Sequence, residues 1–370
     1  MPRVAASQPM RLSHAWFDTM YVVNARSFSQ PGGLGRYTRE IGKRLATANT
    51  KFIAPARPEC GSLGGLLWEQ FALPRHVGPH DVLWSPANLG PIRVRNQVVT
   101  IHDMAVFDHP EWFSQGVRRG VGALLPRLVR SVRYVITVSG FSKERLLAHF
   151  DIDPEQVVVV YPGVGRLVGA DCAEDGTIAT DDATASNGAH SRVPYAIAYG
   201  PRDPRKNLRT LIDAWSYVGQ EVPDLELTVV GQPSSRTFAR NTLANGAPGI
   251  RWAGYLQDSE LADLYSGASL FVYPSLYEGF GLPPLEAMLY GVPSVVSDIP
   301  VLREVYGESV RYVDPYDPVD VARGIIETVR CSSARDQLVK TFAATVRKYS
   351  WDRAGEAVCG ILDRVDTSTR

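Results

Sequence analysis

The sequence predicts an α/β protein made of two doubly wound, Rossmann-like domains that face each other across a cleft. Three observations predict this class. The chain has 370 residues, more than one hydrophobic core normally accommodates. Short apolar runs alternate with helix-like patterns along most of its length. A polar segment without apolar periodicity, residues 166–192, separates the pattern into two halves.

The expected strands are short and almost entirely apolar, which is typical of parallel strands buried on both faces. In the first half they are residues 15–23, 81–86, 97–103, 134–139 and 157–164. In the second half they are residues 194–200, 225–232, 250–255, 270–275, 293–298 and 310–314. Ligands of open parallel sheets bind beyond the carboxyl ends of the strands, so functional residues are expected directly after these runs.

Two domains follow from this pattern. We expect the first domain to span residues 1–165 and the second to span residues 193–345, with residues 166–192 as a flexible linker. The net charge of zero conceals a difference between the halves. Residues 1–164 hold 19 Lys and Arg against 12 Asp and Glu, whereas the remainder holds 20 against 27. A basic half and an acidic half suggest different surroundings for each.

The four cysteines show no CxxC spacing, so neither a zinc site nor a disulfide scaffold is expected. This cysteine usage is typical of a protein in a reducing compartment. The N-terminus lacks the apolar stretch of a signal peptide, and no window is long enough for a transmembrane helix. The expected location is the cytoplasm, with attachment to the inner face of the cell membrane left open.

The segment SLYEGFGLPPLEAMLYGVPSVVSD carries the strongest functional signal. Glu278 and Glu286 enclose two glycines, Gly279 and Gly281, and a helix is expected to begin near Pro283. Glycines leave backbone N–H groups accessible, and the positive end of the helix favours anions. One carboxylate precedes the helix and the other is expected in its first turn. Carboxylates accept hydrogen bonds from sugar hydroxyl groups, so this pattern predicts a site for a diphosphate and sugars.

This segment resembles the E-x7-E motif of the family 4 retaining glycosyltransferases, which have the GT-B fold. The resemblance extends over nearly the whole chain in the order of the family. The further segments that resemble it are residues 31–45, 98–113, 135–146, 198–215 and 250–275. The resemblance also implies that the helix expected in residues 346–370 crosses back to the first domain.

The resemblance implies a role for each residue of the motif. Glu278 would contact the donor hexose beside the departing phosphate, and Glu286 would hold the nucleotide ribose. The backbone from Gly279 through Phe280 and Gly281 to Leu282 would bind the hexose and diphosphate. Lys206 matches the family's phosphate lysine, and a cation is chemically required there because the leaving nucleoside diphosphate develops negative charge.

Other positions match less completely. The family often has an Arg directly after the Gly that ends the first strand of the donor domain, but Pro201 stands there. Arg202, one residue later, is expected to assist Lys206, and Arg205 competes for that role. His102 ends a strand where the resemblance places a histidine that contacts the transferred sugar.

The glycine loop of the first half precedes a helix. Gly33 and its neighbouring glycines there allow close approach of a phosphate or sugar, or else form a tight turn. Asp103 is expected to orient loops rather than to react. Asp151 and Asp153 form a DxD sequence that we interpret as turn and cap chemistry, not as a metal site. We expect no metal and no cofactor.

The amino-acid sequence of these motifs is similar to that of bacterial α-mannosyltransferases of exopolysaccharide assembly, such as those of acetan and xanthan. This similarity implies GDP-mannose as the donor and a polyprenyl-diphosphate oligosaccharide as the acceptor. A UDP-sugar is the alternative donor. One alternative function is a non-catalytic sugar-nucleotide-binding protein. Another is a GT-B relative of different chemistry, such as a sugar-nucleotide epimerase or a phosphorylase, which would need a pyridoxal-binding lysine.

Residues 114–133 are expected to form a basic amphipathic helix. The apolar residues predicted on one face are Val117, Val121, Leu124, Leu128 and Val132. The arginines mostly on other faces are Arg118, Arg119, Arg127, Arg130 and Arg133. The helix either packs on the core with a solvated basic side or contacts anionic lipid or a lipid-linked diphosphate. No nucleic-acid-binding motif accompanies these arginines, so nucleic acid is not an expected partner.

Overall fold

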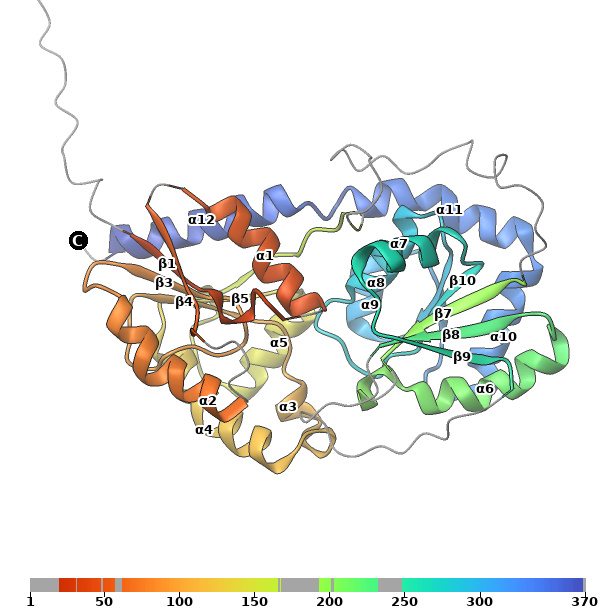
Figure 1. Cartoon of the computed structure of the whole chain (residues 1–370), viewed down its shortest axis with the longest axis horizontal. Coiled ribbons are helices and arrows are strands. Elements are labelled where there is room, and N and C mark those ends of the chain that lie inside the picture. The colour runs from red at the N-terminus through yellow and green to blue at the C-terminus, as the bar shows by residue number, and fades with distance from the viewer. Residues whose placement is uncertain are drawn as a thin grey trace, which may run out of the picture.

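The computed structural model contains two parallel sheets of six strands each, one in each half of the chain (Figure 1). It describes residues 20–30, 32–47, 49–56, 62–165, 167, 193–200, 203–231 and 248–368. Helices cover both faces of each sheet (Figure 1). The predicted class of two doubly wound α/β domains is therefore confirmed.

The first sheet has the strand order β2-β1-β3-β4-β5-β6. Its strands are β1 (Tyr21–Asn24), β2 (Thr50–Ile53), β3 (Val82–Ser85), β4 (Gln97–Ile101), β5 (Tyr134–Thr137) and β6 (Val157–Val159). Strand β2 was not predicted from the sequence. It lies at the edge of the sheet and exposes Lys51 and Phe52, so it lacks the apolar run of a strand buried on both faces.

Helices of the first domain cover this sheet from both sides. They are α1 (Gly33–Leu45), α2 (Ser62–Leu67), α3 (Ala105–Asp108), α4 (Gln115–Ser131) and α5 (Gly140–His149). Single turns are η2 (Ala25–Ser27), the π-helical η3 (Trp68–Ala72), η4 (Leu73–His76), η5 (Pro110–Trp112) and η6 (Pro154–Gln156). The side chain of Asp153 caps η6, accepting a 2.9 Å hydrogen bond from the N–H of Glu155, so the DxD sequence does form a turn and cap.

The amphipathic helix predicted for residues 114–133 is α4. The four arginines within α4 are exposed, as is Arg133 just after it, but the buried face of the helix differs slightly from the prediction. Leu125 and Val129 are buried together with Leu128, whereas Leu124 is only half-buried. Leu125 and Val129 lie four residues apart, next to the predicted row of Leu128 and Val132, so the apolar stripe is rotated by about one residue.

The second sheet has the strand order β12-β11-β10-β7-β8-β9. Its strands are β7 (Tyr195–Tyr199), β8 (Glu226–Val230), β9 (Ile250–Gly254), β10 (Leu270–Tyr273), β11 (Ser294–Ser297) and β12 (Arg311–Val313). Numbered within the domain, this is the Rossmann order 3-2-1-4-5-6 read from the other edge. The order reverses between β7 and β10, and ligands of such sheets bind at the carboxyl ends of the strands beside that reversal.

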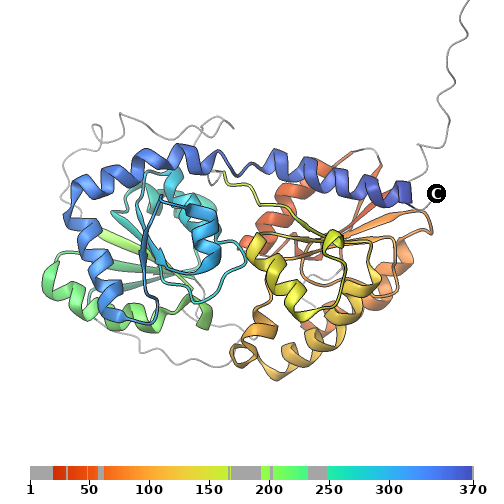
Figure 2. The ribbon, with the colours of Figure 1, turned by 180° about the vertical axis from the view of Figure 1, so that it is seen from behind.

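Helices of the second half are η7 (Pro204–Lys206), α6 (Leu208–Glu221), α7 (Asp258–Ser266), α8 (Leu282–Leu289), α9 (Pro300–Tyr306), α10 (Pro318–Arg330), α11 (Ser332–Val346) and α12 (Trp351–Ser368). The helices α6 and α10 pack together on one face of the sheet, and α7 and α8 lie on the other (Figure 1). Helix α12 lies beside α1 on the first domain, as Figure 2 also shows.

The chain passes twice between the domains, and the two crossings touch. The N–H of Val164 donates a 3.3 Å hydrogen bond to the carbonyl of Tyr349. A Cβ at Gly163 would lie 2.1 Å from the backbone nitrogen of Trp351, so this contact requires glycine. No helix within the described ranges is long and apolar enough to span a bilayer.

Candidate active site

The loop after β10 leads into α8 through a glycine with a left-handed backbone. Gly281 has φ +92°, and its carbonyl accepts a hydrogen bond from the hydroxyl of Tyr306. A Cβ at this position would lie 2.7 Å from that hydroxyl, so a larger residue would strain both the backbone and the contact. Pro283 occupies the first turn of α8, where a missing N–H is tolerated. No side chain caps this end of the helix.

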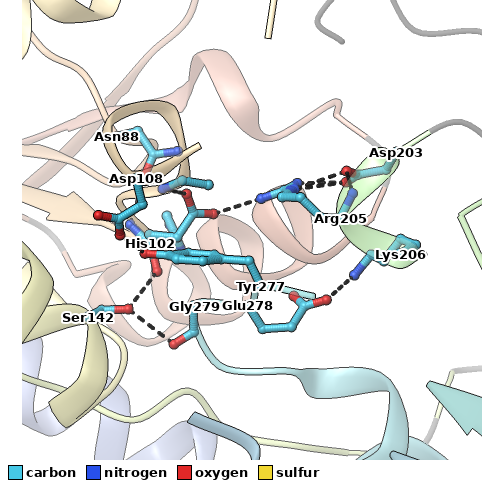
Figure 3. A network of polar contacts seen from close by, with 12 residues as sticks. Asn88, His102, Asp108, Ser142, Asp203, Arg205, Lys206, Tyr277, Glu278 and Gly279 are labelled. Atoms are coloured by element: carbon cyan, nitrogen blue, oxygen red, sulfur yellow. Dashed lines mark hydrogen bonds and ion pairs between the residues drawn. The ribbon is translucent and has the colours of Figure 1, made fainter. Parts of the chain in front are cut away.

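Lys206 and Glu278 meet at the reversal of the second sheet. The Nζ of Lys206 lies 2.6 Å from Oε1 of Glu278 (Figure 3). It also lies 2.7 Å from the hydroxyl of Tyr273. A Cβ at Gly200 would lie 2.3 Å from Cγ of Lys206, so glycine lets the lysine pass close to the end of β7. Both charged side chains are largely buried, with 18% and 11% of their surface exposed.

The second motif carboxylate, Glu286, is the fifth residue of α8. It therefore lies at the start of the second turn, not in the first as expected, because the helix begins at Leu282. It forms an ion pair with Arg36 of α1, which comes from the other domain. Burial raises the pKa of Glu286, and the positive charge of Arg36 partly offsets this rise.

Gly279 contacts the first domain directly. A Cβ at Gly279 would lie 1.9 Å from the carbonyl oxygen of His102. The Gly279 carbonyl accepts a 2.6 Å hydrogen bond from Oγ of Ser139. The hydroxyl of Ser142 lies 3.2 Å from both the Gly279 and the His102 carbonyl oxygens (Figure 3). The donor-side loop and the end of β4 thus form one connected network.

His102 is held in a defined tautomer. Its Nε2 lies 2.8 Å from the carbonyl oxygen of Pro86, which can only accept, so Nε2 carries a proton. Its backbone N–H donates to Oδ1 of Asn88 at 2.7 Å, and its ring makes an edge contact with Tyr37. Burial lowers the pKa of His102, so at neutral pH the ring is uncharged and Nδ1 is a hydrogen-bond acceptor.

Arg205 lies between Asp203 of its own domain and Asp103 of the first domain. It forms an ion pair with Asp203 at 2.7 Å (Figure 3). It forms a second with Asp103 at 3.0 Å, and Oδ1 of Asp103 also accepts a hydrogen bond from the N–H of Ala105. Burial lowers the pKa of Arg205, but the two aspartates outweigh it and raise the pKa overall. Arg202 lies outside the described residues, so its expected role beside Lys206 stays a prediction.

Two further residues predicted to bind the donor are Gly33, at the start of α1, and Phe280, in the loop before α8. Gly33 begins α1, and neither it nor Gly32 would place a Cβ within 4 Å of another atom, which leaves space beside the backbone. The side chain of Phe280 is 5% exposed and packs against the rings of Tyr161 and Tyr349. The ring of Phe280 therefore belongs to the core, so only its backbone is a candidate for contact with a ligand.

Glu304 and Asp108 also make contacts between the domains that sequence reasoning did not find. The carboxylate of Glu304 in α9 accepts hydrogen bonds from the N–H groups of Gly140 and Phe141 at the start of α5, and from the hydroxyl of Tyr161. It caps a helix of the other domain, which favours a negative charge at that end. Nothing near Glu304 in the sequence indicates this, because its partners are more than 140 residues away.

Asp108 makes the second contact. Its carboxylate accepts a 2.7 Å hydrogen bond from the hydroxyl of Tyr277, next to Glu278, and also contacts Arg145 and His149. Burial alone would raise the pKa of Asp108, but these hydrogen bonds outweigh burial and lower it to about 2. Within the described ranges, no group of three or more His, Cys, Asp or Glu residues is arranged to hold a metal ion.

Comparison with known protein families gives two matches that together span most of the chain. Residues 31–165 match the model described as Glycosyltransferase Family 4, and residues 180–343 match the model described as Glycosyl transferases group 1.

Curated relatives include the O-antigen chain mannosyltransferase B of Escherichia coli, which is 30% identical over 267 residues, covering 71% of this chain and 68% of the relative. The O-antigen chain mannosyltransferase RfbU of Salmonella typhimurium strain LT2 is 29% identical, and the match covers 72% of this chain and 69% of the relative. Among solved structures, sucrose-phosphate synthase of Thermosynechococcus elongatus superposes with a TM-score of 0.68 over 95% of this chain and 99% of its own. That structure is 18% identical, so it supports the fold alone.

Proposed function

Because the chain belongs to glycosyltransferase family 4 and has the GT-B fold, we propose that this glycosyltransferase moves mannose from GDP-mannose onto a polyprenyl-diphosphate-linked oligosaccharide in exopolysaccharide biosynthesis, with retention of the anomeric configuration. One observation carries the proposal: Lys206 and Glu278 form a 2.6 Å ion pair at the reversal of the second sheet, where nucleotides bind in this architecture.

The ion pair explains how a donor could be bound and activated. In the free protein the ammonium of Lys206 is neutralised by Glu278. The diphosphate of a donor would bring its own negative charge to Lys206. Glu278 could then accept hydrogen bonds from hexose hydroxyl groups. As the bond between the anomeric carbon and the phosphate oxygen breaks, Lys206 would stabilise the charge that develops on the leaving group.

The other site residues have supporting roles in this proposal. Glu286 holds the ribose, and the backbone N–H groups between Gly279 and Leu282 face the hexose and diphosphate. The neutral ring of His102 contacts the transferred sugar. Gly33 allows the backbone at the start of α1 to approach the same ligand. Arg202 or Arg205 assists Lys206, and because Arg205 already pairs with two aspartates, we favour Arg202.

We propose that no residue forms a covalent intermediate. The acceptor hydroxyl attacks the anomeric carbon from the face that the diphosphate leaves, and its proton passes to a phosphate oxygen of that leaving group. The new bond joins the acceptor oxygen to the anomeric carbon as the sugar–phosphate bond breaks. The proposed chemistry requires strong hydrogen-bond donors at the phosphate, and Lys206 is one such donor.

The choice of sugar and acceptor has separate support. Two relatives are named O-antigen chain mannosyltransferases, which favours mannose and a growing glycan. The exposed arginines of α4 favour a lipid-linked diphosphate acceptor and contact with anionic lipid at the inner face of the cell membrane. We propose that the first domain presents this helix to that surface.

Incubation with GDP-mannose, UDP-glucose and other sugar nucleotides, with and without lipid-linked acceptor, tests the proposal. Release of nucleoside diphosphate and NMR of the product linkage are the measurements. Acceptor-dependent GDP release with an α-linked mannose supports it. Turnover of a UDP-sugar would replace the donor, and tight donor binding without turnover would favour a non-catalytic binding protein.

A further inference from the structure

Arg36 spans the interface between the two domains. It lies in the first turn of α1, and 16% of its side-chain surface is exposed. One terminal nitrogen forms the ion pair with Oε1 of Glu286, and the other donates a 2.6 Å hydrogen bond to the carbonyl of Gly165. One guanidinium thus links the first domain, the chain segment that leaves it, and the α8 carboxylate of the second domain.

We propose that Arg36 is a positioning residue for the donor nucleotide: it keeps the Glu286 carboxylate ionised and oriented toward the ribose, and it stays paired with Glu286 when the donor binds. The inference rests on the proposed function, since it assumes that Glu286 holds a ribose. It adds a further residue of the first domain, besides His102 and Gly33, to a donor site whose other residues lie in the second.

The burial of Glu286 argues that the pair persists with the donor bound. Only 10% of its side-chain surface is exposed, and a bound nucleotide would exclude more water. Ribose hydroxyl groups are neutral, so they cannot balance the buried charge, whereas a guanidinium can. A carboxylate has about four acceptor positions, so a bond from Arg36 to Oε1 leaves capacity for two hydroxyl groups.

The contact with Gly165 argues that Arg36 does not swing away. A guanidinium is planar, and its two terminal nitrogens point in fixed directions. With one of them bound to the backbone of Gly165, the other is directed at Glu286. Displacement by the donor would break both interactions and leave the carboxylate of Glu286 buried without its cation, which is costly.

The groups that face Glu286 set its response to pH. They are Arg36 from α1, Asp258 and Tyr265 from α7, Tyr199 from β7 and Tyr306 from α9. Burial raises the pKa of Glu286 most, and the negative charge of Asp258 raises it further. Arg36 is the strongest influence that lowers it. Removal of Arg36 should therefore leave Glu286 protonated at a higher pH than in the wild type.

The test measures the affinity for GDP and for UDP by calorimetry from about pH 6 to about pH 8. The variants are Arg36→Met and Arg36→Lys, and Arg44→Met is the matched control. Arg44 lies on the same helix, but its partners, Glu40 and Asp352, lie away from the donor site. Circular dichroism and the thermal midpoint establish that each variant is folded.

We expect Arg36→Met to weaken nucleotide binding about tenfold or more at pH 7 and to make the affinity rise with pH, as Glu286 ionises at a higher pH. Arg36→Lys keeps the charge, so its nucleotide affinity should lie between those of the wild type and Arg36→Met. Its affinity should change with pH as that of the wild type does. Arg44→Met should match the wild type throughout.

Wild-type affinity and pH dependence in Arg36→Met would overturn the inference, and so would tighter binding, which would mean that Arg36 competes with the ribose. If Arg36→Met does not fold, Arg36→Lys decides: a pH dependence shifted away from the wild type contradicts the role. A wild-type protein that binds neither nucleotide would contradict the proposed function itself, a result distinct from the loss of the Arg36 effect alone.

Discussion

A Cβ added to Gly279 would lie 1.9 Å from the carbonyl oxygen of His102, so the loop after β10 and the end of β4 meet backbone to backbone. The two residues are on different domains and carry different proposed roles, one toward the donor and one toward the transferred sugar. The domains therefore touch at the site where sugar transfer would occur.

Gly279→Ala should uncouple the two sides of the site. Its Cβ cannot fit beside the His102 carbonyl, so either the loop or the domain arrangement must shift. A misplacement of about 1 Å at a reacting centre can cost about a hundredfold in rate. We expect kcat to fall by about tenfold to a hundredfold, measured as nucleoside diphosphate release. In the control Gly116→Ala, where a Cβ meets no atom within 4 Å, kcat should not change.

The two motif carboxylates should give different kinetic effects. Glu278→Ala removes the partner of Lys206 beside the proposed reaction centre, so it should mainly lower kcat. Glu286→Ala removes the partner of Arg36 at the proposed ribose site, so it should mainly weaken nucleotide binding. Steady-state kinetics with calorimetry of the nucleoside diphosphate separates these effects. Wild-type kinetics in both variants would refute the assignment of the site.

Lys206→Met should lower kcat about a hundredfold to a thousandfold, the usual cost of losing one charge-stabilising donor at a reaction centre. It should also lower the free energy of unfolding, because Glu278 would be left largely buried without its cation. Denaturant unfolding and kcat are measured on the same sample. Lys43→Met removes a lysine that is 65% exposed and should change neither quantity.

Asp108→Asn should reveal a pH-dependent contribution to stability. The pKa of Asp108 is lowered to about 2 in the folded protein, from an ordinary value near 3.8. A lowered folded-state pKa stabilises the protein above pH 3.8, and this stabilisation is lost as pH falls toward 2. We expect the free energy of unfolding of the wild type to exceed that of the variant by about 1 to 2 kcal/mol near pH 6.

Urea unfolding at several pH values measures this difference, which should shrink below about pH 4. A difference that is the same at pH 3 and pH 6 would mean that the Asp108 carboxylate is not held by its partners in ionised form. Tyr277→Phe, which removes one hydrogen bond to Asp108, should show a smaller loss with the same trend.

The sequence was sufficient for the fold class because parallel strands that are buried on both faces leave apolar runs, as in β4 and β10. It was insufficient for β2, an edge strand that exposes Lys51. The expected start near Pro283 put Glu286 in the first turn of α8, whereas the helix begins one residue earlier, after the left-handed Gly281, so that Glu286 begins the second turn.

The contacts between domains could not be predicted in the same way. Arg36 and Glu286 are 250 residues apart, and although Glu286 belongs to the motif, nothing in the sequence indicates Arg36 as its partner. Glu304 likewise looks like a surface glutamate until α5 of the other domain is placed beside it. Such pairs depend on how two folded domains meet, which local periodicity does not encode.

Thermal unfolding of the wild type and of Glu286→Ala with GDP, UDP, ADP and their sugar conjugates tests the central claim most directly. A ligand at a hundred times its dissociation constant adds about 2.7 kcal/mol and should raise the midpoint by a few degrees. We predict a rise for the wild type with GDP and GDP-mannose, and a much smaller rise for Glu286→Ala. If no nucleotide moves the wild-type midpoint, the proposed donor site is contradicted.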